Sequence, residues 1–234
     1  TGFKGSWLTL WLSEIGAKVL GISKNIPTNP SHYKLLSLEK KIQSKKIDIK
    51  DFKKVKKIIK QFKPDFIFHL AAQSIVKKSY KDTIETWKTN LLGTINILES
   101  LKENKKQTVT IIITSDKCYK NFETKRGYVE NDILGGEDPY GASKSAAEIA
   151  INSYVKSFFN SKKNKNVIVS TRAGNVIGGG DWTDNRLLPD CIKSWSKRKI
   201  VKIRNLNSTR PWQHVLDVVY GYLLLGVKAK YNKI

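Results

Sequence analysis

The stretch Thr108-Val109-Thr110-Ile111-Ile112-Ile113-Thr114-Ser115-Asp116-Lys117 decides the fold of this chain. Its first seven residues are β-branched and show no regular polar alternation, which is typical of a parallel strand buried on both faces. Asp116 and Lys117 follow directly and would supply an acid and a base side by side. We therefore expect a buried strand whose carboxyl end is followed by an acid and a base that could take part in catalysis.

A helix is predicted to follow in Asp138-Pro139-Tyr140-Gly141-Ala142-Ser143-Lys144, because proline favours the first turn of a helix. Tyr140 and Lys144 are four residues apart and share one helix face. A lysine placed there lowers the pKa of a phenol from about 10 and makes it a usable base. Lysine is abundant in this chain, so the spacing alone is weak evidence for a catalytic pair. The position of this helix between two predicted strands strengthens that interpretation.

Strands and helices alternate along the chain, which predicts an α/β fold with a doubly wound, Rossmann-like parallel sheet. The predicted strands are 18–22, 46–49, 65–70, 109–115 and 167–172, the predicted helices are 6–12, 51–62, 83–102 and 140–159, and 26–44 is a loop with room for one short helix. The pattern loosens after Arg172. We expect a dinucleotide-binding domain over 1–173 and part of a smaller substrate-binding region over 174–234, interleaved with the first.

A phosphate-binding loop is predicted at Gly2-Phe3-Lys4-Gly5, directly before the first helix. Glycines three apart let backbone N–H groups approach a pyrophosphate at the positive end of a helix. A full fingerprint has a further glycine and a strand upstream, which we expect to precede Thr1. Ser23 and Lys24 stand where an acidic residue usually binds the ribose, so NAD and NADP both stay open.

The formal net charge of +23 makes nucleic-acid binding a live hypothesis. The lysines are nevertheless spread over every predicted helix and loop, including the run Lys162-Lys163-Asn164-Lys165, and the tryptophans are not interleaved with the basic runs. A solvated lysine-rich surface is the favoured interpretation, and we expect no nucleic-acid partner. No apolar run reaches about 18 residues, so we expect no membrane span.

Cysteine and histidine usage argues against a metal site. Cys118 and Cys191 are isolated, and the three histidines do not cluster, so we expect two reduced thiols in a cytoplasmic protein. We interpret His69 as a satisfied histidine at a strand end. No signal peptide is visible, and a chain that starts at Thr1 and contains no methionine is interpreted as a piece of a longer protein.

Six collinear segments together resemble the extended short-chain dehydrogenases/reductases and, within them, the nucleotide-sugar 4,6-dehydratases. The segments are 1–7, 69–74, 115–119, 131–140, 172–182 and 210–215. The specific ones are Ser115-Asp116-Lys117 and Gly178-Gly179-Gly180-Asp181-Trp182. The related dTDP-glucose enzymes resemble a Thr-Asp-Glu pattern instead, so Lys117 favours the branch that acts on CDP-sugars.

The resemblance implies a role for each matching residue. Tyr140, Lys144 and Ser115 would serve a transient oxidation at carbon 4 of the sugar. Lys117 would then remove the carbon-5 proton, and Asp116 would protonate the departing 6-hydroxyl. NAD would contact Gly2, Phe3, Gly5, Asp48, Ile49, Leu70, Ala71, Ala72 and Asn90 besides Tyr140 and Lys144, and the nucleotide sugar would contact Ser74, Asn175, Arg186 and Arg210. The resemblance also implies a homodimer formed by the helices 83–102 and 140–159, and a place in deoxysugar and lipopolysaccharide O-antigen biosynthesis.

Two other functions stay open at this point. A nucleotide-sugar epimerase of the same family would keep Tyr140 and Lys144 but would not need the acid and base at Asp116 and Lys117. A basic, non-catalytic nucleic-acid-binding module would account for the charge instead.

Overall fold

The computed structural model describes residues 1–161, 164–203 and 205–231, so Lys162 and Lys163 of the lysine run lie outside the described residues. The chain divides into two compact units. The first unit comprises Thr1–Lys46 and Gly174–Tyr220, and the second comprises Ile47–Ala173 and Gly221–Ile234. The helix α10 (Val215–Lys230) contributes residues to both units.

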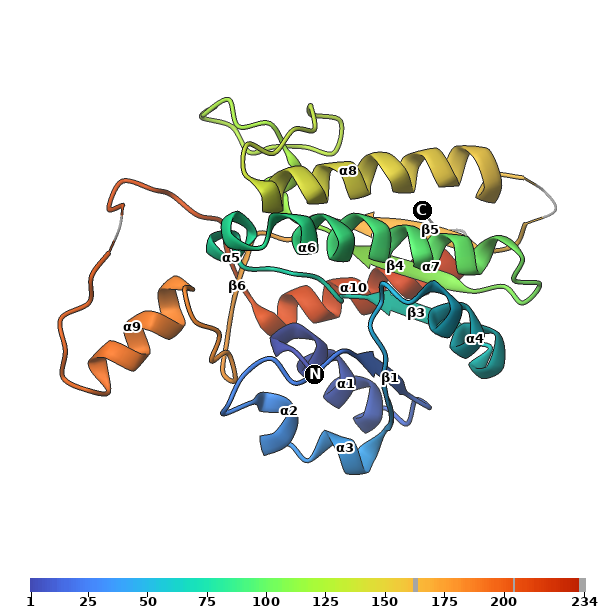
Figure 1. The fold of residues 1–234 in the computed structure, drawn as a ribbon, viewed down its shortest axis with the longest axis horizontal. Coiled ribbons are helices and arrows are strands. Elements are labelled where there is room, and N and C mark those ends of the chain that lie inside the picture. Colours follow the sequence, from blue (N-terminus) through green and yellow to red (C-terminus); the bar gives the residue numbers. More distant parts are fainter. Residues whose placement is uncertain (162–163, 204, 232–234) are drawn as a thin grey trace. The chain divides into compact units, whose positions relative to one another are not determined.

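The second unit is built on a three-stranded parallel sheet (Figure 1). Its order is β3 (Phe66–His69), β4 (Val109–Ile113) and β5 (Val167–Thr171). All five residues of β4 are buried, because the strand is central in the sheet and covered on both faces. The buried parallel strand predicted from the β-branched run is therefore confirmed.

Helices cover both faces of this sheet. On one face, α4 (Phe52–Phe62), α7 (Gly93–Lys102) and α8 (Pro139–Tyr154) share a single apolar cluster with β4. Its buried members are Val55, Ile59, Ile97, Leu98, Leu101, Ile112, Ile151 and Phe159. On the other face, Gly226 of α10 lies beside Phe66 and Phe68. The doubly wound α/β architecture predicted from the sequence is thus present in the second unit.

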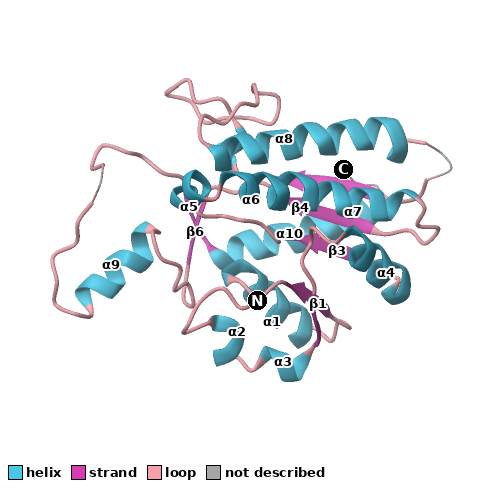
Figure 2. Ribbon diagram, viewed as in Figure 1, coloured by secondary structure: helices cyan, strands magenta, loops and turns pink. Residues whose placement is uncertain are grey.

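Two of the predicted helices, drawn in cyan at α6–α7 and at α8 in Figure 2, contain π-helical turns. The helix predicted over 83–102 consists of α6 (Thr83–Trp87), a π turn (Lys88–Leu92) and α7. The helix predicted over 140–159 consists of α8 and a π turn (Val155–Phe159). Such turns often occur at functional sites, and the first of them contains Asn90. The short helix α5 (Val76–Lys81) was not predicted.

The first unit contains two separate pairs of parallel strands. The strand β1 (Leu20–Ser23) pairs with β2 (Gln43–Lys46), and β6 (Asn175–Ile177) pairs with β7 (Trp212–His214). Its helices are α1 (Phe3–Glu14), α2 (His32–Leu35), α3 (Leu38–Lys41), α9 (Leu187–Trp195) and the first residues of α10. The predicted first helix and first strand are confirmed.

The strand predicted over 46–49 is wrong, because β2 ends at Lys46. The apolar residues of this segment have another role. Ile47 and Ile49 pack against the apolar cluster of the second unit, while the Asp48 carboxylate accepts the N–H of Lys50 at 3.0 Å. This turn leads directly into α4, whose predicted N-cap, Asp51, accepts the N–H of Lys54 at 3.1 Å. The predicted loop 26–44 likewise holds two short helices and the start of β2.

The region after Arg172 is more regular than the sequence indicated. It holds β6, α9, β7 and the 16-residue helix α10. No turn residue marks the start of α10, because its first residue, Val215, follows directly on His214 of β7. The helix was missed for that reason.

In the described parts of the chain, no helix is long and apolar enough to cross a membrane, and no three histidine, cysteine or acidic residues converge to hold a metal ion. Cys118 and Cys191 are both free and buried.

Candidate active site

The Ser-Asp-Lys segment forms a tight turn directly after β4. Ser115 caps a 3₁₀ turn of Asp116–Cys118. Its hydroxyl donates to Asp116 Oδ1 at 2.9 Å and accepts the N–H of Lys117 at 3.2 Å. Ser115 is 7% exposed, whereas Asp116 and Lys117 are half-buried. The turn therefore fixes the serine and leaves the following acid and base partly accessible.

The backbone of this turn is bonded to the segment that follows β5. The N–H of Thr114 donates to Thr171 O at 2.9 Å, and the N–H of Asp116 donates to Ala173 O at 3.2 Å. The pairing of β4 with β5 thus continues beyond the ends of both strands. This continuation holds Asp116 at the carboxyl edge of the sheet.

The helix α8 presents the predicted Tyr–Lys pair. Asp138 caps the helix, and its carboxylate accepts the N–H groups of Tyr140 at 2.9 Å and Gly141 at 3.0 Å. Tyr140 is 8% and Lys144 is 5% exposed. The Lys144 Nζ donates to Ile113 O, the last residue of β4, at 3.1 Å. The ammonium group is therefore fixed two residues before Ser115.

The first turn of α8 packs directly on the Ser-Asp-Lys turn. A Cβ placed on Gly141 would lie 2.9 Å from Lys117 O. Gly136 makes an even closer approach, since a Cβ there would lie 2.0 Å from the carbonyl carbon of Gly141. The Ser145 hydroxyl lies 2.7 Å from Cys118 O and accepts the N–H of Gly136 at 3.0 Å. These contacts bring all five predicted catalytic residues into one part of the second unit.

Asn90 joins the loop after β3 to α8. It is 1% exposed, and its side chain exchanges two hydrogen bonds with the backbone of Gln73, at 2.8 and 3.0 Å. Its Nδ2 also donates to Ser143 Oγ at 2.9 Å, and that hydroxyl donates to Tyr140 O at 2.7 Å. The predicted role of Asn90 toward a cofactor stays a prediction. The network itself, including Gln73 and Ser143, was not predicted, because its partners lie far apart in the sequence.

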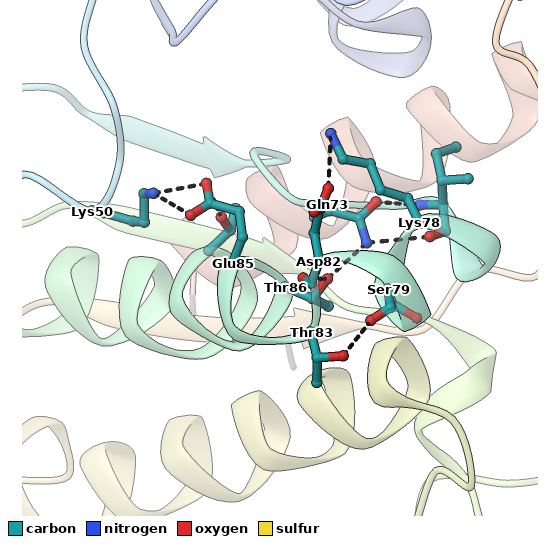
Figure 3. Close-up of polar contacts among 10 residues, drawn as sticks. Lys50, Gln73, Lys78, Ser79, Asp82, Thr83, Glu85 and Thr86 are labelled. Carbon is teal, nitrogen blue, oxygen red and sulfur yellow. Dashed lines mark hydrogen bonds and ion pairs between the residues drawn. The ribbon is translucent and has the colours of Figure 1, made fainter.

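The loop after β3 carries Leu70, Ala71 and Ala72, and Gln73 braces it against the following helices (Figure 3). The Gln73 Nε2 donates to Ile75 O at 3.2 Å and to Thr86 Oγ1 at 3.0 Å, while Oε1 accepts the N–H of Ile75 at 2.8 Å. The two alanines present small side chains, and Ala71 is exposed. The side chain of Gln73 thus holds the loop in place, and the small side chains of the two alanines leave space beside the loop.

Asp48 and Ile49, predicted to contact a cofactor, lie in the turn before α4. Lys50 binds the Glu85 carboxylate at 2.6 Å (Figure 3). It also lies 3.6 Å from Asp48 Oδ2. Ile49 packs against Gly93, where a Cβ would lie 2.8 Å from Ile49 Cγ2. Ile49 therefore has a packing role whatever else it contacts.

His69 is a buried strand-end residue, as interpreted from the sequence. It is 5% exposed, and its Nε2 lies 3.1 Å from Thr94 Oγ1. Burial, followed by the nearby charge of Lys144, lowers the pKa of His69 from 6.5 to about 3. The imidazole is therefore neutral at physiological pH.

The predicted phosphate loop belongs to the first unit, where Gly2 is the N-cap of α1. No side chain of the described residues caps this helix. A Cβ placed on Gly2 or Gly5 would meet no atom within 4 Å. The start of α1, including Phe3, is therefore open to a phosphate group, which backbone N–H groups at a helix start bind well.

The predicted substrate contacts are divided between the units. Ser74 is an exposed residue of the second unit. In the first unit, Asn175 begins β6 and Arg186 pairs with Asp181 at 2.9 Å. Arg210 is exposed there and donates to Thr209 O at 2.7 Å.

The Gly-Gly-Gly-Asp-Trp motif packs on α1 within the first unit, which was not predicted. The Trp7 indole donates to Gly179 O at 2.9 Å, and its ring lies 4.6 Å from that of His32. Gly180 has a φ of 86°, and a Cβ there would lie 2.4 Å from the His32 ring. Both the backbone conformation and the close contact require glycine.

A helix bearing tyrosine and lysine one turn apart, packed on a parallel strand that is followed by a serine, is the arrangement of the short-chain dehydrogenases/reductases. Solved structures agree with this fold. The chain superposes on an epimerase from Methanothermobacter thermautotrophicus with a TM-score of 0.83 and 26% identity, covering 97% of this chain and 65% of that one. It superposes on a dTDP-glucose 4,6-dehydratase from Bacillus anthracis, solved with NAD, with a TM-score of 0.80 and 21% identity, covering 97% and 69%.

Sequence comparison places the chain within that class. Residues 1–232 match the family described as GDP-mannose 4,6 dehydratase, and the chain belongs to this family. It is 46% identical over 229 residues to a CDP-glucose 4,6-dehydratase from Salmonella typhimurium. The match covers 97% of this chain and 64% of the length of that relative.

The close approach of Gly136 to α8 generates a stability prediction. Gly136→Ala would force the Cβ into the backbone at Gly141, so we expect a loss of about 1–3 kcal/mol in the free energy of unfolding. Gly127→Ala in the same loop is the matched control, because a Cβ there meets no atom within 4 Å. We expect it to change stability by less than about 0.5 kcal/mol. Urea unfolding measures both, and equal midpoints for the two variants would contradict the packing described above.

The low pKa of buried His69 predicts a pH-dependent stability. Below pH 6.5 the unfolded chain takes up a proton at this histidine, whereas the folded protein does so only near pH 3. Stability is therefore lost as the pH falls through this window, by at most about 1.4 kcal/mol per pH unit. His69→Gln removes this titration. The difference in unfolding free energy between the wild type and His69→Gln should shrink from pH 7 to pH 4, and a constant difference would refute the assignment.

Proposed function

We propose that the intact protein is an NAD-dependent nucleotide-sugar 4,6-dehydratase that converts CDP-glucose to CDP-4-keto-6-deoxyglucose. The observation that carries the proposal is the packing of the Ser-Asp-Lys turn on the first turn of α8, where Gly141 meets Lys117 O. We infer that this contact brings the acid and the base toward Tyr140 and Lys144. The similar Salmonella protein, which bears the name CDP-glucose 4,6-dehydratase, supports the choice of nucleotide.

The residues at the start of α1 fit a dinucleotide. The open backbone at Gly2 and Gly5 admits a pyrophosphate, and the helix start favours its negative charge. NAD is the proposed cofactor, as in the similar dTDP-glucose enzyme. Its nicotinamide would supply a reversible hydride acceptor, so that the reaction has no net redox change.

Oxidation at carbon 4 would be served by Tyr140, Lys144 and Ser115. The Lys144 ammonium, fixed on Ile113 O, stabilises the anionic form of Tyr140, which takes the proton of the sugar 4-hydroxyl. The Ser115 hydroxyl bonds the same sugar oxygen. In the present arrangement this hydroxyl donates to Asp116, so it turns toward the sugar when substrate binds.

Water loss would be served by the next two residues of the turn. The new carbonyl at carbon 4 acidifies the proton on carbon 5, and Lys117 would remove it as the base. Asp116 would give a proton to the departing 6-hydroxyl.

An epimerase is the second candidate, since the chain also superposes on an epimerase. Product analysis separates the two activities, because only dehydration yields a 4-keto-6-deoxy sugar. Incubation of the intact protein with CDP-glucose, and with the other nucleoside-diphosphate glucoses in parallel, tests the proposal. Salt-sensitive binding of DNA or RNA without NAD binding would instead support the nucleic-acid-binding module.

We further propose that the intact protein is a cytoplasmic homodimer paired through α6–α7 and α8. Ile84 is 70% and Ile149 is 61% exposed on these helices, which is unfavourable for apolar side chains that stay in water. Replacing both by glutamate should convert the dimer to a monomer in sedimentation at micromolar concentration. Ile15→Glu, at an equally exposed position outside these helices, is the control. A monomeric wild type would contradict the proposal.

Because Tyr140 and Lys117 are proposed to act in different steps, variants of the two residues should block the reaction at different steps. Lys117→Ala should still oxidise bound CDP-glucose, since Tyr140, Lys144 and Ser115 are intact, and should then stall before water loss. Loss of a positioned base costs about 10²–10⁴ in rate. Tyr140→Phe should block the first step, so little reduced nicotinamide would form. Single-turnover absorbance of the reduced nicotinamide distinguishes the two.

Solvent-deuterium incorporation at carbon 5 completes this test. Lys120→Ala is the matched control, because Lys120 is an exposed lysine three residues further along the same segment. It should behave as the wild type does. Wild-type deuterium exchange in Lys117→Ala would show that another group is the base.

A further inference from the structure

Arg172 is a nearly buried arginine to which the proposed reaction assigns no role. It follows β5 directly, and its side chain is 16% exposed. Its guanidinium donates to Glu148 Oε2 at 2.8 Å and to Glu130 O at 2.9 Å, and it lies 4.9 Å from the centre of the Tyr119 ring. One side chain therefore joins α8, the loop 120–135 and the residue that follows the Ser-Asp-Lys turn.

Glu148 fixes the helix end of this connection. It lies one helical turn beyond Lys144, and its side chain is 4% exposed. Its carboxylate also accepts hydrogen bonds from the hydroxyls of Thr114 and Ser170, the latter at 3.0 Å. A buried carboxylate with this many donors is held in a single position.

Tyr119 fixes the other end. It directly follows the turn Asp116–Cys118, and its ring stacks on Tyr128 at 5.2 Å between centres. The loop returns to this position, since Tyr119 bridges Leu134 and the N–H of Gly135 donates to Cys118 O at 2.8 Å. The stack of Arg172, Tyr119 and Tyr128 thus closes the loop onto the turn.

The charges around Arg172 are suited to this arrangement. Burial alone lowers the pKa of Arg172, but its bonds to Glu148 and Tyr119 outweigh burial and raise it, so the guanidinium stays charged. Burial also raises the pKa of neighbouring Cys118 to about 12, and the thiol stays neutral. Because the Cys118 thiol is neutral, the guanidinium of Arg172 pairs with the carboxylate of Glu148.

We propose that Arg172 is a positioning residue that holds the Asp116–Lys117 turn against the Tyr140–Lys144 helix through Glu148 and Tyr119. The inference rests on the proposed function, because it assigns Arg172 to the water-loss half of that reaction. Tyr140 and Lys144 are held by α8 and by Ile113 O, and the backbone before Ser115 is held by the bond from Thr114 to Thr171 O, so oxidation at carbon 4 does not depend on Arg172. Proton removal at carbon 5 does, because Lys117 and Asp116 reach the sugar only from this turn.

Two variants test the connection without leaving a buried charge unpaired, which would itself unfold the protein. The double variant Arg172→Gln/Glu148→Gln removes both charges together. Tyr119→Leu removes the ring under the guanidinium and keeps the ion pair. The matched control is Arg126→Gln, which breaks an exposed arginine–carboxylate pair with Asp132 in the same loop.

Single-turnover kinetics of the intact protein with NAD and CDP-glucose gives the decisive comparison. In both test variants we expect reduction of the nicotinamide within about threefold of the wild-type rate and a KM for CDP-glucose that is unchanged. The subsequent water loss should slow about 10–100-fold, as misplacement by a fraction of an ångström to one ångström produces. Equal slowing of both half-reactions, or equal slowing in Arg126→Gln, would overturn the inference.

Amide hydrogen exchange supplies a readout that does not depend on activity. The segment 116–120 should exchange faster in both test variants than in Arg126→Gln, while α8 keeps its protection. Unchanged exchange in this segment would overturn the inference. A wild type that turns over no nucleotide sugar would refute the proposed function instead, and the exchange data would still decide whether Arg172 holds the turn.

Discussion

The hydrogen bond from the Lys144 ammonium to Ile113 O is the interaction on which the site depends. Both residues are buried, so the charge needs a polar partner, and the carbonyl at the end of β4 supplies one. The bond couples two requirements. The strand must end at Ile113 to present this carbonyl, and α8 must begin at Pro139 for Lys144 to reach it.

Close backbone packing provides the second constraint. Gly136 and Gly141 allow the loop, the Ser-Asp-Lys turn and α8 to approach more closely than side chains would permit. Native interiors tolerate little change in volume at such contacts. The spacing between the turn and the helix is therefore set by backbone atoms. The backbone positions from which the long side chains of Lys117 and Tyr140 extend are fixed as a result.

The parts of this arrangement that sequence predicts are those encoded locally. The β-branched run before Ser115, the cap at Asp51 and the proline at 139 act within a few residues, and the structure confirms all three elements. The parts that sequence missed are encoded by distant partners. Asn90 meets Ser143 across 53 residues, and the isoleucines before α4 imitate a strand because they pack on helices that come later in the chain.

The site also separates two tasks between two kinds of element. Groups proposed for oxidation at carbon 4 sit on α8 and at the strand end, where the core fixes them. Groups proposed for water loss sit on a three-residue turn that hydrogen bonds, ring stacking and close contact with α8 hold in place. A turn can change its residues without disturbing the sheet. An epimerase and a dehydratase can therefore share the oxidising half of such a site and differ in the residues of the turn.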